Sequence, residues 1–279
     1  MQSPAPVAQA DFRTAIGWAQ PWMTSLCDSG EALCRPGIDW RSAVNAIARS
    51  CMLATENGHL IEFVAQSELP VHASYEAFIH ATGKVPTRDN LHDFLNALIW
   101  LHYPLVKARL NAMQAADIAS TRSPTATQLL SAPARRSRHR DALTLFDENA
   151  VLVATSDWSL NSLLRQHAWS DLFVDRRAML GTCYDVFPFG HALIEKLVVP
   201  YKAITAHAWL ILVEPQFFEQ STSDKVRYLD QTIARQLDGS LQTLSLTPLP
   251  VLGVPGWWPA QNAAFYADQD VFRPLRTVG

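Results

Sequence analysis

Residues 87–122 carry the strongest helical periodicity in the chain, and this stretch constrains the fold more than any other feature. At about 100° per residue, one face of the stretch is apolar and is predicted to lie in the core. That face consists of Phe94, Ala97, Leu98, Leu101, Leu105, Ala108 and Ala112. Pro104 removes a backbone hydrogen bond and clashes with the preceding turn of a helix. We therefore expect either a kink at Pro104 or a second helix that begins there.

The opposite face of this stretch is polar but poor in the Glu and Lys that normally solvate a helix. Its residues are Asp89, His92, Asp93, Asn96, Trp100, Tyr103, Lys107, Asn111 and Gln114. Residues four apart are neighbours on a helix, and a histidine beside a carboxylate is the minimum for a general base. We predict His92, Asp93 and Asn96 as catalytic residues. The alternative is a structural network at a helix start, with Thr87 or Asp89 as the cap.

Residues 190–199 are predicted to form a helix that carries a second candidate site. His191 and Glu195 share one face of it at four-residue spacing, and His207 follows later in the chain. Imidazole and carboxylate groups are ligands of zinc and iron, so these three residues are the predicted metal ligands. The alternative is a histidine at a helix start beside a charge cluster of Glu195, Lys196 and Lys202.

Residues 143–146 and 151–154 are two apolar runs separated by four polar or small residues, which is the pattern of a β-hairpin. Carboxylates at the ends of adjacent strands can hold Mg²⁺. Asp141, Asp147 and Glu148 are therefore a third candidate site. The alternative is ordinary turn chemistry, because Asp is favoured where a chain reverses.

The other expected elements follow from periodicity and from cap and breaker residues. They are a strand over residues 60–65 and helices over residues 11–26, 40–51, 74–82 (ending at Gly83), 160–180, 190–199 and 223–237 (capped by Ser223). Residues 206–213 fit either a buried strand or a helix. Residues 246–259 are rich in Pro and Gly and are expected to be irregular.

Together these elements predict a mainly helical α+β protein, with a helical first half and a second half built on a small antiparallel hairpin or sheet packed by helices. Residues 123–140 are rich in Ser, Pro, Ala and Arg and are the best candidate for a linker. They suggest a boundary between a mainly helical part (1–140) and an α+β part (141–279) that ends in an irregular Pro- and Trp-rich segment. We expect both parts to form one compact unit.

Composition sets the broad class of protein. Hydrophobic residues make up 48% of the chain and charged residues 18%, so a disordered or fibrous chain is excluded. A net charge of -3 argues against a general binder of nucleic acid or membrane surfaces. The sequence shows neither a secretory signal nor the roughly 18 consecutive apolar residues that cross a bilayer. We therefore expect a soluble cytoplasmic protein.

Long and unusual strings, KVPTRDNLHDFLNALIW and FGHALIEKL among them, occur in residues 84–100, 140–153, 189–197, 205–207 and 252–274. On these strings the chain resembles a bacterial family catalogued as domain of unknown function 3025. The resemblance spans most of the chain and implies no established activity. One departure is Asn149-Ala150, where the pattern expects Asn-Gly, so the turn at this point is expected to differ.

No glycine-rich phosphate loop and no G-x-S-x-G motif occurs in the sequence. The leading hypothesis is a cytosolic metal-dependent or acid–base hydrolase that uses its His, Asp, Asn and Glu cluster on a small-molecule substrate. The sequence identifies neither that substrate nor a cofactor nor the oligomeric state.

The alternative hypothesis is a non-catalytic binding protein that contacts RNA. Phosphates would meet the basic cluster, and bases would stack on the aromatic pair Trp257 and Trp258. The basic cluster consists of Arg135, Arg136, Arg138, His139 and Arg140. A solvated loop, and tryptophans that pin the C-terminal segment to the body, explain the same residues better. Nucleic acid is therefore not the expected partner.

Overall fold

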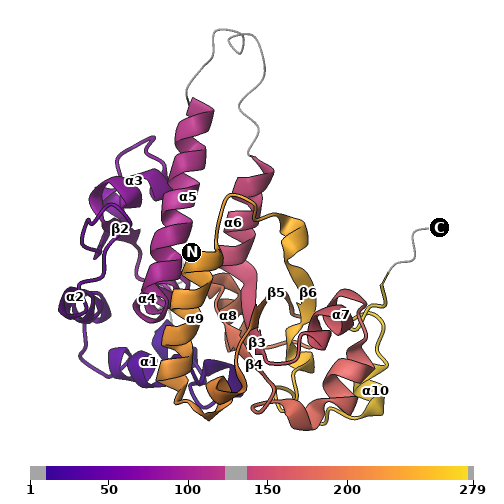
Figure 1. Ribbon diagram of the computed structural model, residues 1–279. Coiled ribbons are helices and arrows are strands. Elements are labelled where there is room, and N and C mark those ends of the chain that lie inside the picture. The colour runs from indigo at the N-terminus through magenta and orange to yellow at the C-terminus, as the bar shows by residue number, and fades with distance from the viewer. Residues whose placement is uncertain (1–10, 123–136, 276–279) are drawn as a thin grey trace, which may run out of the picture.

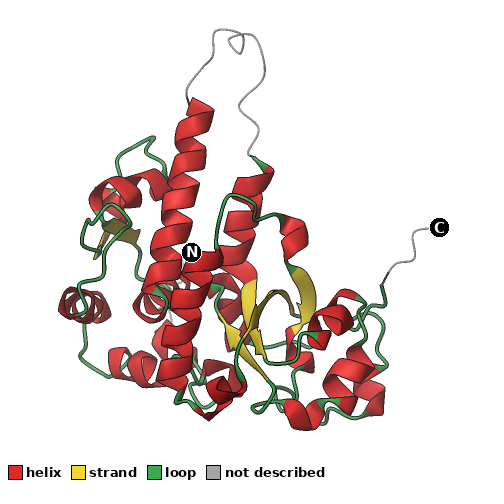
Figure 2. Ribbon diagram, in the orientation of Figure 1, coloured by secondary structure: helices red, strands yellow, loops and turns green. Residues whose placement is uncertain are grey.

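Helices make up most of the computed structural model, which describes residues 11–122 and 137–275, and a four-stranded sheet lies to one side of them (Figures 1 and 2). The α+β, mainly helical class expected from the sequence is confirmed. The helices are α1 (Cys27–Leu33), α2 (Trp40–Ser50), α3 (Tyr75–Thr82), α4 (Leu91–His102), α5 (Pro104–Arg122), α6 (Arg138–Asn149), α7 (Ser159–Arg165), α8 (His191–Val198), α9 (Thr222–Gln236) and α10 (Ala263–Tyr266). The strands are β1 (Glu62–Ala65), β2 (Lys84–Thr87), β3 (Ala150–Thr155), β4 (Tyr184–Pro188), β5 (Thr205–Leu212) and β6 (Thr247–Pro250).

The periodic stretch folds as two helices, and Pro104 is the first residue of the second, α5. Proline suits this position because the first N–H of a helix has no partner inside the helix. The side chain of Asp230, from α9, accepts hydrogen bonds from the backbone N–H groups of Leu105 (3.2 Å) and Val106 (2.9 Å). Of the two outcomes expected at Pro104, a second helix is the observed one.

The start of α4 differs from both expected caps. Asn90 caps the helix, because its side chain accepts a hydrogen bond from the backbone N–H of Asp93. Thr87 instead closes β2 and donates its hydroxyl to the carbonyl of Val85, while Asp89 accepts from the indole of Trp40.

The main sheet has the strand order β4-β3-β5-β6. β3 pairs antiparallel with β4 and parallel with β5, and β6 pairs antiparallel with β5, so the sheet is mixed. All of β3 is buried, because it is a central strand and α6 packs over it and over β5. Residues 206–213, which fitted either element type, lie mostly in strand β5. The second, smaller sheet is a parallel pair of β1 and β2 in the first half of the chain.

The expected hairpin at residues 143–154 is wrong. Residues 143–146 lie inside α6, which leads directly into β3. The buried residues Ala142, Leu143 and Phe146 have helical spacing, and the side chain of Ser137 caps the helix. The antiparallel partner of β3 is β4, which follows only after α7. The apolar run at residues 143–146 is therefore part of a helix that begins before the run, at Arg138.

Two expected helices are broken in the structure. Residues 11–26 contain short 3-10 turns, because Pro21 cannot occupy the interior of a helix. The helix expected over residues 160–180 ends as α7 near His167, whose φ is positive (54°), and only short helical turns follow it.

The caps and ends of the other helices mostly follow the sequence. α3 ends at Gly83, whose φ of 74° is the left-handed conformation that glycine adopts without strain. The cap of α9 is Ser221, which accepts from the backbone N–H of Asp224, so the predicted cap Ser223 is wrong. Residues 246–259 are largely irregular as expected, apart from the short strand β6 and a 3-10 turn.

Helices from the two halves of the chain pack against each other. α5 contacts α6 and α9, and α4 contacts α8 and α9. α5 and α9 lie near the centre of the view in Figure 1. Buried apolar residues from both halves form one continuous cluster. Of the expected linker, residues 123–136 lie outside the described residues, and Arg138 already belongs to α6. Within the described ranges, no helix has the length and apolar character that spanning a membrane requires.

Candidate functional site

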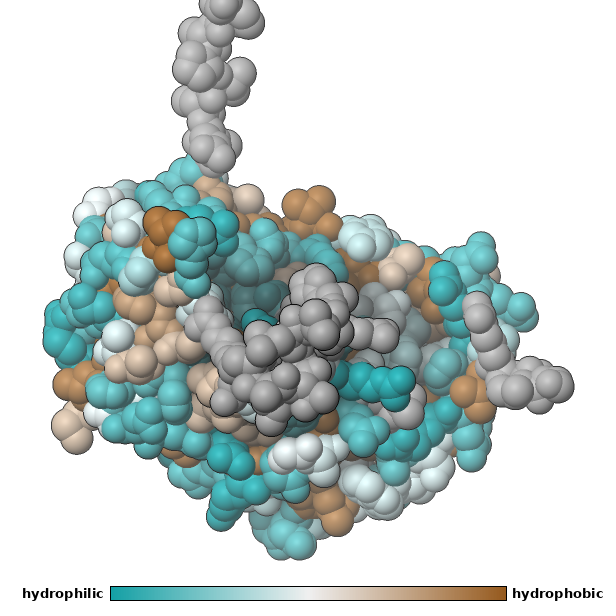
Figure 3. Space-filling model, turned by 90° about the horizontal axis from the view of Figure 1, so that it is seen from above, coloured by the Kyte–Doolittle hydropathy of each residue, from teal (hydrophilic) through white to brown (hydrophobic). Residues whose placement is uncertain are grey.

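A cavity of about 330 Å³ lies between α3, α4, α5, the end of α6 and the start of α8. Its polar lining consists of Gln66, Tyr75, Glu76, Arg88, His92, Asp93, Asn96, Lys107, Asn111, Gln114, Asp147, Glu148 and His191. Figure 3 looks down on the molecule from above and shows a recess with hydrophilic residues at its floor. Most of the polar face of α4 and α5 lines this cavity, which explains why that face lacks the Glu and Lys of a solvated helix.

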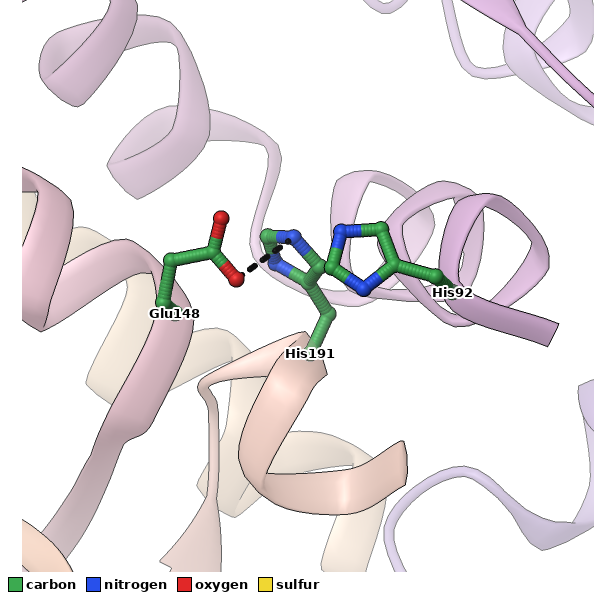
Figure 4. Close-up of side chains that lie close together, drawn as sticks. All are labelled: His92, Glu148 and His191. Carbon is green, nitrogen blue, oxygen red and sulfur yellow. Dashed lines mark ion pairs between the residues drawn. The ribbon is translucent and has the colours of Figure 1, made fainter. Parts of the chain in front are cut away.

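Three potential metal ligands meet in the wall of the cavity. His92 comes from α4, Glu148 from the end of α6 and His191 from the first position of α8 (Figure 4). One ligand atom from each residue lies within 4.8 Å of the other two. The Nε2 atom of His191 is 3.3 Å from Oε2 of Glu148, and the two imidazole rings are 4.6 Å apart, edge to face. This donor set matches the two histidines and one carboxylate of many zinc and iron sites.

Gly190 allows α8 to approach the end of α6. A Cβ atom at this position would lie 2.4 Å from the backbone carbonyl oxygen of Glu148 and equally close to the backbone nitrogen of Asn149. The backbone N–H of Gly190 also donates to the carbonyl of Ala150 at 2.8 Å. The glycine is therefore required by backbone contact, and this contact sets His191 beside Glu148.

Glu195 orients His92 from outside the cluster. Its Oε2 atom is 2.8 Å from Nδ1 of His92, one turn along α8 from His191. With Nδ1 engaged by the carboxylate, Nε2 of His92 is the nitrogen that remains to bind a ligand. A carboxylate behind a histidine is the usual support of a metal-bound imidazole, because it fixes the ring and its tautomer.

Burial dominates the electrostatics of the cluster. It lowers the pKa of His191 to about 3, against the opposing effect of Asp147, so the imidazole is neutral near pH 7. Burial also raises the pKa of Glu148, and the neighbouring charge of Asp147 adds to that increase. Burial alone would raise the pKa of Asp147 as well, but the nearby charge and the hydrogen bond of Lys107 act against burial, and that pKa is lowered. Lys107 donates to Asp147, so this pair is already satisfied.

A second group of polar residues lies elsewhere along the same cavity, around Glu76 of α3. Asn111 donates from Nδ2 to the Oε2 atom of Glu76 at 2.7 Å and to its backbone carbonyl at 2.9 Å. The amide nitrogen of Gln114 donates to both carboxylate oxygens of Glu76 when its side chain is oriented to satisfy them. Burial, followed by the charge of Asp147, raises the pKa of Glu76 to about 7.

The predicted catalytic residues all line the cavity but differ in their contacts. His92 belongs to the three-ligand cluster. Asp93 accepts hydrogen bonds from the backbone and guanidinium of Arg88, which is a network at a helix start of the kind that the structural alternative describes. Asn96 contacts the hydroxyl of Tyr75.

The predicted metal ligands are divided between two places. His191 lies in the cluster, and Glu195 contacts it through His92. His207 lies on β5 beside Ala150 in the sheet and is absent from both the cavity wall and the cluster of described ligands. The two candidate sites of the sequence thus meet in one place, through His92 and His191.

Sequence reasoning placed Glu148 in a different candidate site and did not single out Glu76. The third candidate, Asp141, Asp147 and Glu148, lies on α6 and not on a hairpin. Glu148 reaches His191 only through the packing of α8 on α6. The signal that could have found Glu76 is its position next to Tyr75 on a short helix of mainly apolar residues.

The residues of the RNA-binding alternative lie elsewhere. Arg135 and Arg136 fall outside the described residues, whereas Arg138 and Arg140 lie in the first turn of α6. Trp257 is 7% exposed and packs against Trp22, and Trp258 stacks on Phe265. These contacts agree with tryptophans that hold the C-terminal segment in place, and the RNA hypothesis stays a prediction.

Comparison with known proteins identifies the family of this chain but assigns it no activity. No curated protein and no solved structure matches the chain. A family model described as "Protein of unknown function (DUF3025)" matches residues 61–276, which include His92, Glu148, His191 and Glu195. The matched region covers most of the chain, so the protein belongs to the DUF3025 family.

Proposed function

We propose that this protein is a metal-dependent hydrolase, in which His92, Glu148 and His191 hold one zinc, iron or manganese ion. The observation that carries the proposal is the convergence of these three side chains on a cavity, with Glu195 behind His92. Their residue types, their spacing and the supporting carboxylate fit a metal centre better than a simple hydrogen-bond network.

Three protein ligands leave room in the coordination sphere for a water molecule and a substrate atom. A zinc ion lowers the pKa of its bound water to about 7 and polarises a carbonyl or phosphoryl oxygen. In this chain, the neutral state of His191 suits coordination, and the engaged Nδ1 of His92 directs its Nε2 atom to the ion. The cavity provides the space in which a polar substrate would reach the ion.

Elemental analysis of the purified protein tests the metal centre. We expect near-stoichiometric zinc, iron or manganese in the wild type and its loss in His92→Ala, His191→Ala and Glu148→Gln. His207→Ala is the matched control, because this histidine lies outside the cluster and should leave the metal content unchanged. Protein without metal, and without a thermal shift on addition of any of the three ions, would falsify the metal centre. Loss of metal in His191→Ala and His207→Ala, but not in His92→Ala or Glu148→Gln, would instead favour the ligand set predicted from the sequence.

Hydrolysis is tested separately with nitrophenyl esters and phosphates. We expect activity that is abolished by a chelator and restored by one of the three metals. Metal binding without any hydrolysis would contradict the hydrolase and leave the metal centre standing. Hydrolysis that survives complete removal of metal would favour an acid–base enzyme that uses the His92–Glu195 pair.

A further inference from the structure

The wall of the cavity around Glu76 offers hydrogen-bond acceptors, because the side-chain amides that contact Glu76 already donate to it. The amide groups of Asn111 and Gln114 donate to Glu76, and that of Asn96 is directed to Tyr75. The ammonium of Lys107 donates to Asp147. A molecule that enters this part of the cavity therefore finds few free donors.

Two buried acceptors in this wall have no partner among the described residues. They are the side-chain carbonyl oxygens of Asn96 and Asn111, whose residues are 8% and 2% exposed. Buried polar atoms in folded proteins are nearly always hydrogen-bonded, so each exception calls for a partner. Both residues line the cavity together with Glu76.

The charges of the cavity wall leave one carboxylate without a cation. Arg88 pairs with Asp93, and Lys107 pairs with Asp147. Glu148 belongs to the metal cluster. Within the part of the chain that the structure describes, no Lys, Arg or His lies at ion-pair distance from Glu76, although this residue keeps some accessible surface toward the cavity.

We propose that Glu76, Asn96 and Asn111 form a subsite for a primary ammonium group of the substrate. An ammonium ion has three N–H donors and no acceptor, which matches one unpaired carboxylate and two unpartnered carbonyl oxygens. A hydroxyl group would supply one donor and no charge. That the bound molecule is a substrate rests on the proposed hydrolase function, but binding of the ammonium group requires no metal ion.

The protonation of Glu76 agrees with this assignment. Burial and the charge of Asp147 raise its pKa to about 7, while Lys107, Asn111 and Arg140 act in the opposite direction. A cation next to Glu76 favours the ionised carboxylate, so it should displace a proton from that fraction of molecules in which Glu76 is neutral. Binding at pH 6.5 should therefore release protons. Calorimetry of the binding in buffers of different ionisation enthalpy measures this release.

The test uses chelator-treated full-length protein and n-butylammonium as the probe. 1-Butanol controls for the apolar tail, and tetramethylammonium controls for charge without N–H donors. We expect n-butylammonium to raise the melting temperature of the wild type and to bind at least tenfold more weakly to Glu76→Gln. Glu68→Gln, an exposed glutamate that pairs with Lys84, is the matched control and should bind like the wild type.

Asn96→Asp is the second variant for the case that Glu76→Gln does not fold, because an added carboxylate in the cavity wall should strengthen binding of the cation. Three results would overturn the proposal: no response of the wild type to n-butylammonium, equal binding by Glu76→Gln, or an equal response to 1-butanol or tetramethylammonium. His92→Ala separates the two proposals. It should lose metal but keep ammonium binding, so failure of one proposal is visible without failure of the other.

Discussion

At the scale of single residues, the candidate site depends on side chains that act through others. Glu195 touches the cluster only at Nδ1 of His92, and 39% of its side chain is exposed. Removing its carboxylate should therefore cost little stability, since exposed ion pairs contribute at most about 1 kcal/mol. Its effect should appear in metal binding, because it fixes the ring that carries the ligand atom.

Glu195→Ala is expected to weaken metal binding by about 10- to 100-fold. Glu195→Gln should fall between this variant and the wild type, because the amide oxygen still accepts from the imidazole. Metal affinity is measured by competition with a chelating indicator, and urea unfolding of the metal-free proteins checks that their stability is unchanged. A purely structural role would appear as the reverse pattern, with lower stability and equal affinity.

Single residues also show how far the sequence could predict the site. His92 and His191 were identified from helical spacing, because that spacing is local information. Their meeting is not local, since His92 and the Glu195 that supports it are 103 residues apart. Glu148 joins them only because Gly190 lets two backbones touch, and no spacing rule reports such an approach.

At the scale of elements, local signals predicted several helices and helix boundaries but not the strand pairing. Pro104 gave reason to expect either a kink or a helix start, and Gly83 marked a helix end. The hairpin prediction failed because residues 143–146 look like a strand in isolation, whereas their role depends on a cap at Ser137. The side chain that caps the start of α5 could not be predicted either, because Asp230 belongs to α9 and is 124 residues away from Val106 in the chain.

Asp230 gives α5 a pH-dependent stability. Burial raises its pKa from 3.8 to about 6, even though two backbone N–H groups favour the carboxylate. Since the folded chain holds this proton more tightly than the unfolded chain, the contribution is fully present below pH 3.8 and is lost as the pH rises to 6. A shift of this size corresponds to about 3 kcal/mol.

We therefore expect the stability of the wild type, relative to Asp230→Asn, to fall between pH 4 and pH 6 and to stay level above it. Urea unfolding at intervals across this range measures the difference. Asp224→Asn on the same helix is the control, because hydrogen bonds from Ser221 and from Arg227 lower the pKa of Asp224. Its contribution has the opposite sign and is lost only as the pH falls below 3.8, so between pH 4 and pH 6 the difference for Asp224→Asn should change little. A flat difference for Asp230→Asn would contradict the assignment.

At the scale of the whole molecule, the two halves share one apolar cluster and one cavity. Contacts of α5 with α6 and α9, and of α4 with α8, cross the boundary suggested near residue 140. The sequence could locate a change of composition there, but it could not show how much surface the two halves bury against each other. Composition reports on each segment, whereas burial depends on the packing between segments.

This packing predicts cooperative unfolding. Far-UV circular dichroism and tryptophan fluorescence in urea should give one transition with the same midpoint. Tryptophans occur in both halves, with Trp40 and Trp100 in the first and Trp169 and Trp209 in the second, so the fluorescence reports on each of them. Two transitions, or midpoints that differ between the two measurements, would show that residues 1–140 and 141–279 unfold as separate domains.

The spread of His92, Glu148 and His191 along the chain has a consequence for the topology of the polypeptide. An ion bound to all three would join α4, α6 and α8 at one point and close two large loops of chain, much as a cross-link does. Closing a loop removes entropy from the unfolded chain, and the effect grows slowly with loop length. Because α8 is synthesised last of the three helices, the ion could be captured by the complete set only once synthesis has passed residue 191. Metal uptake would then follow the meeting of all three helices.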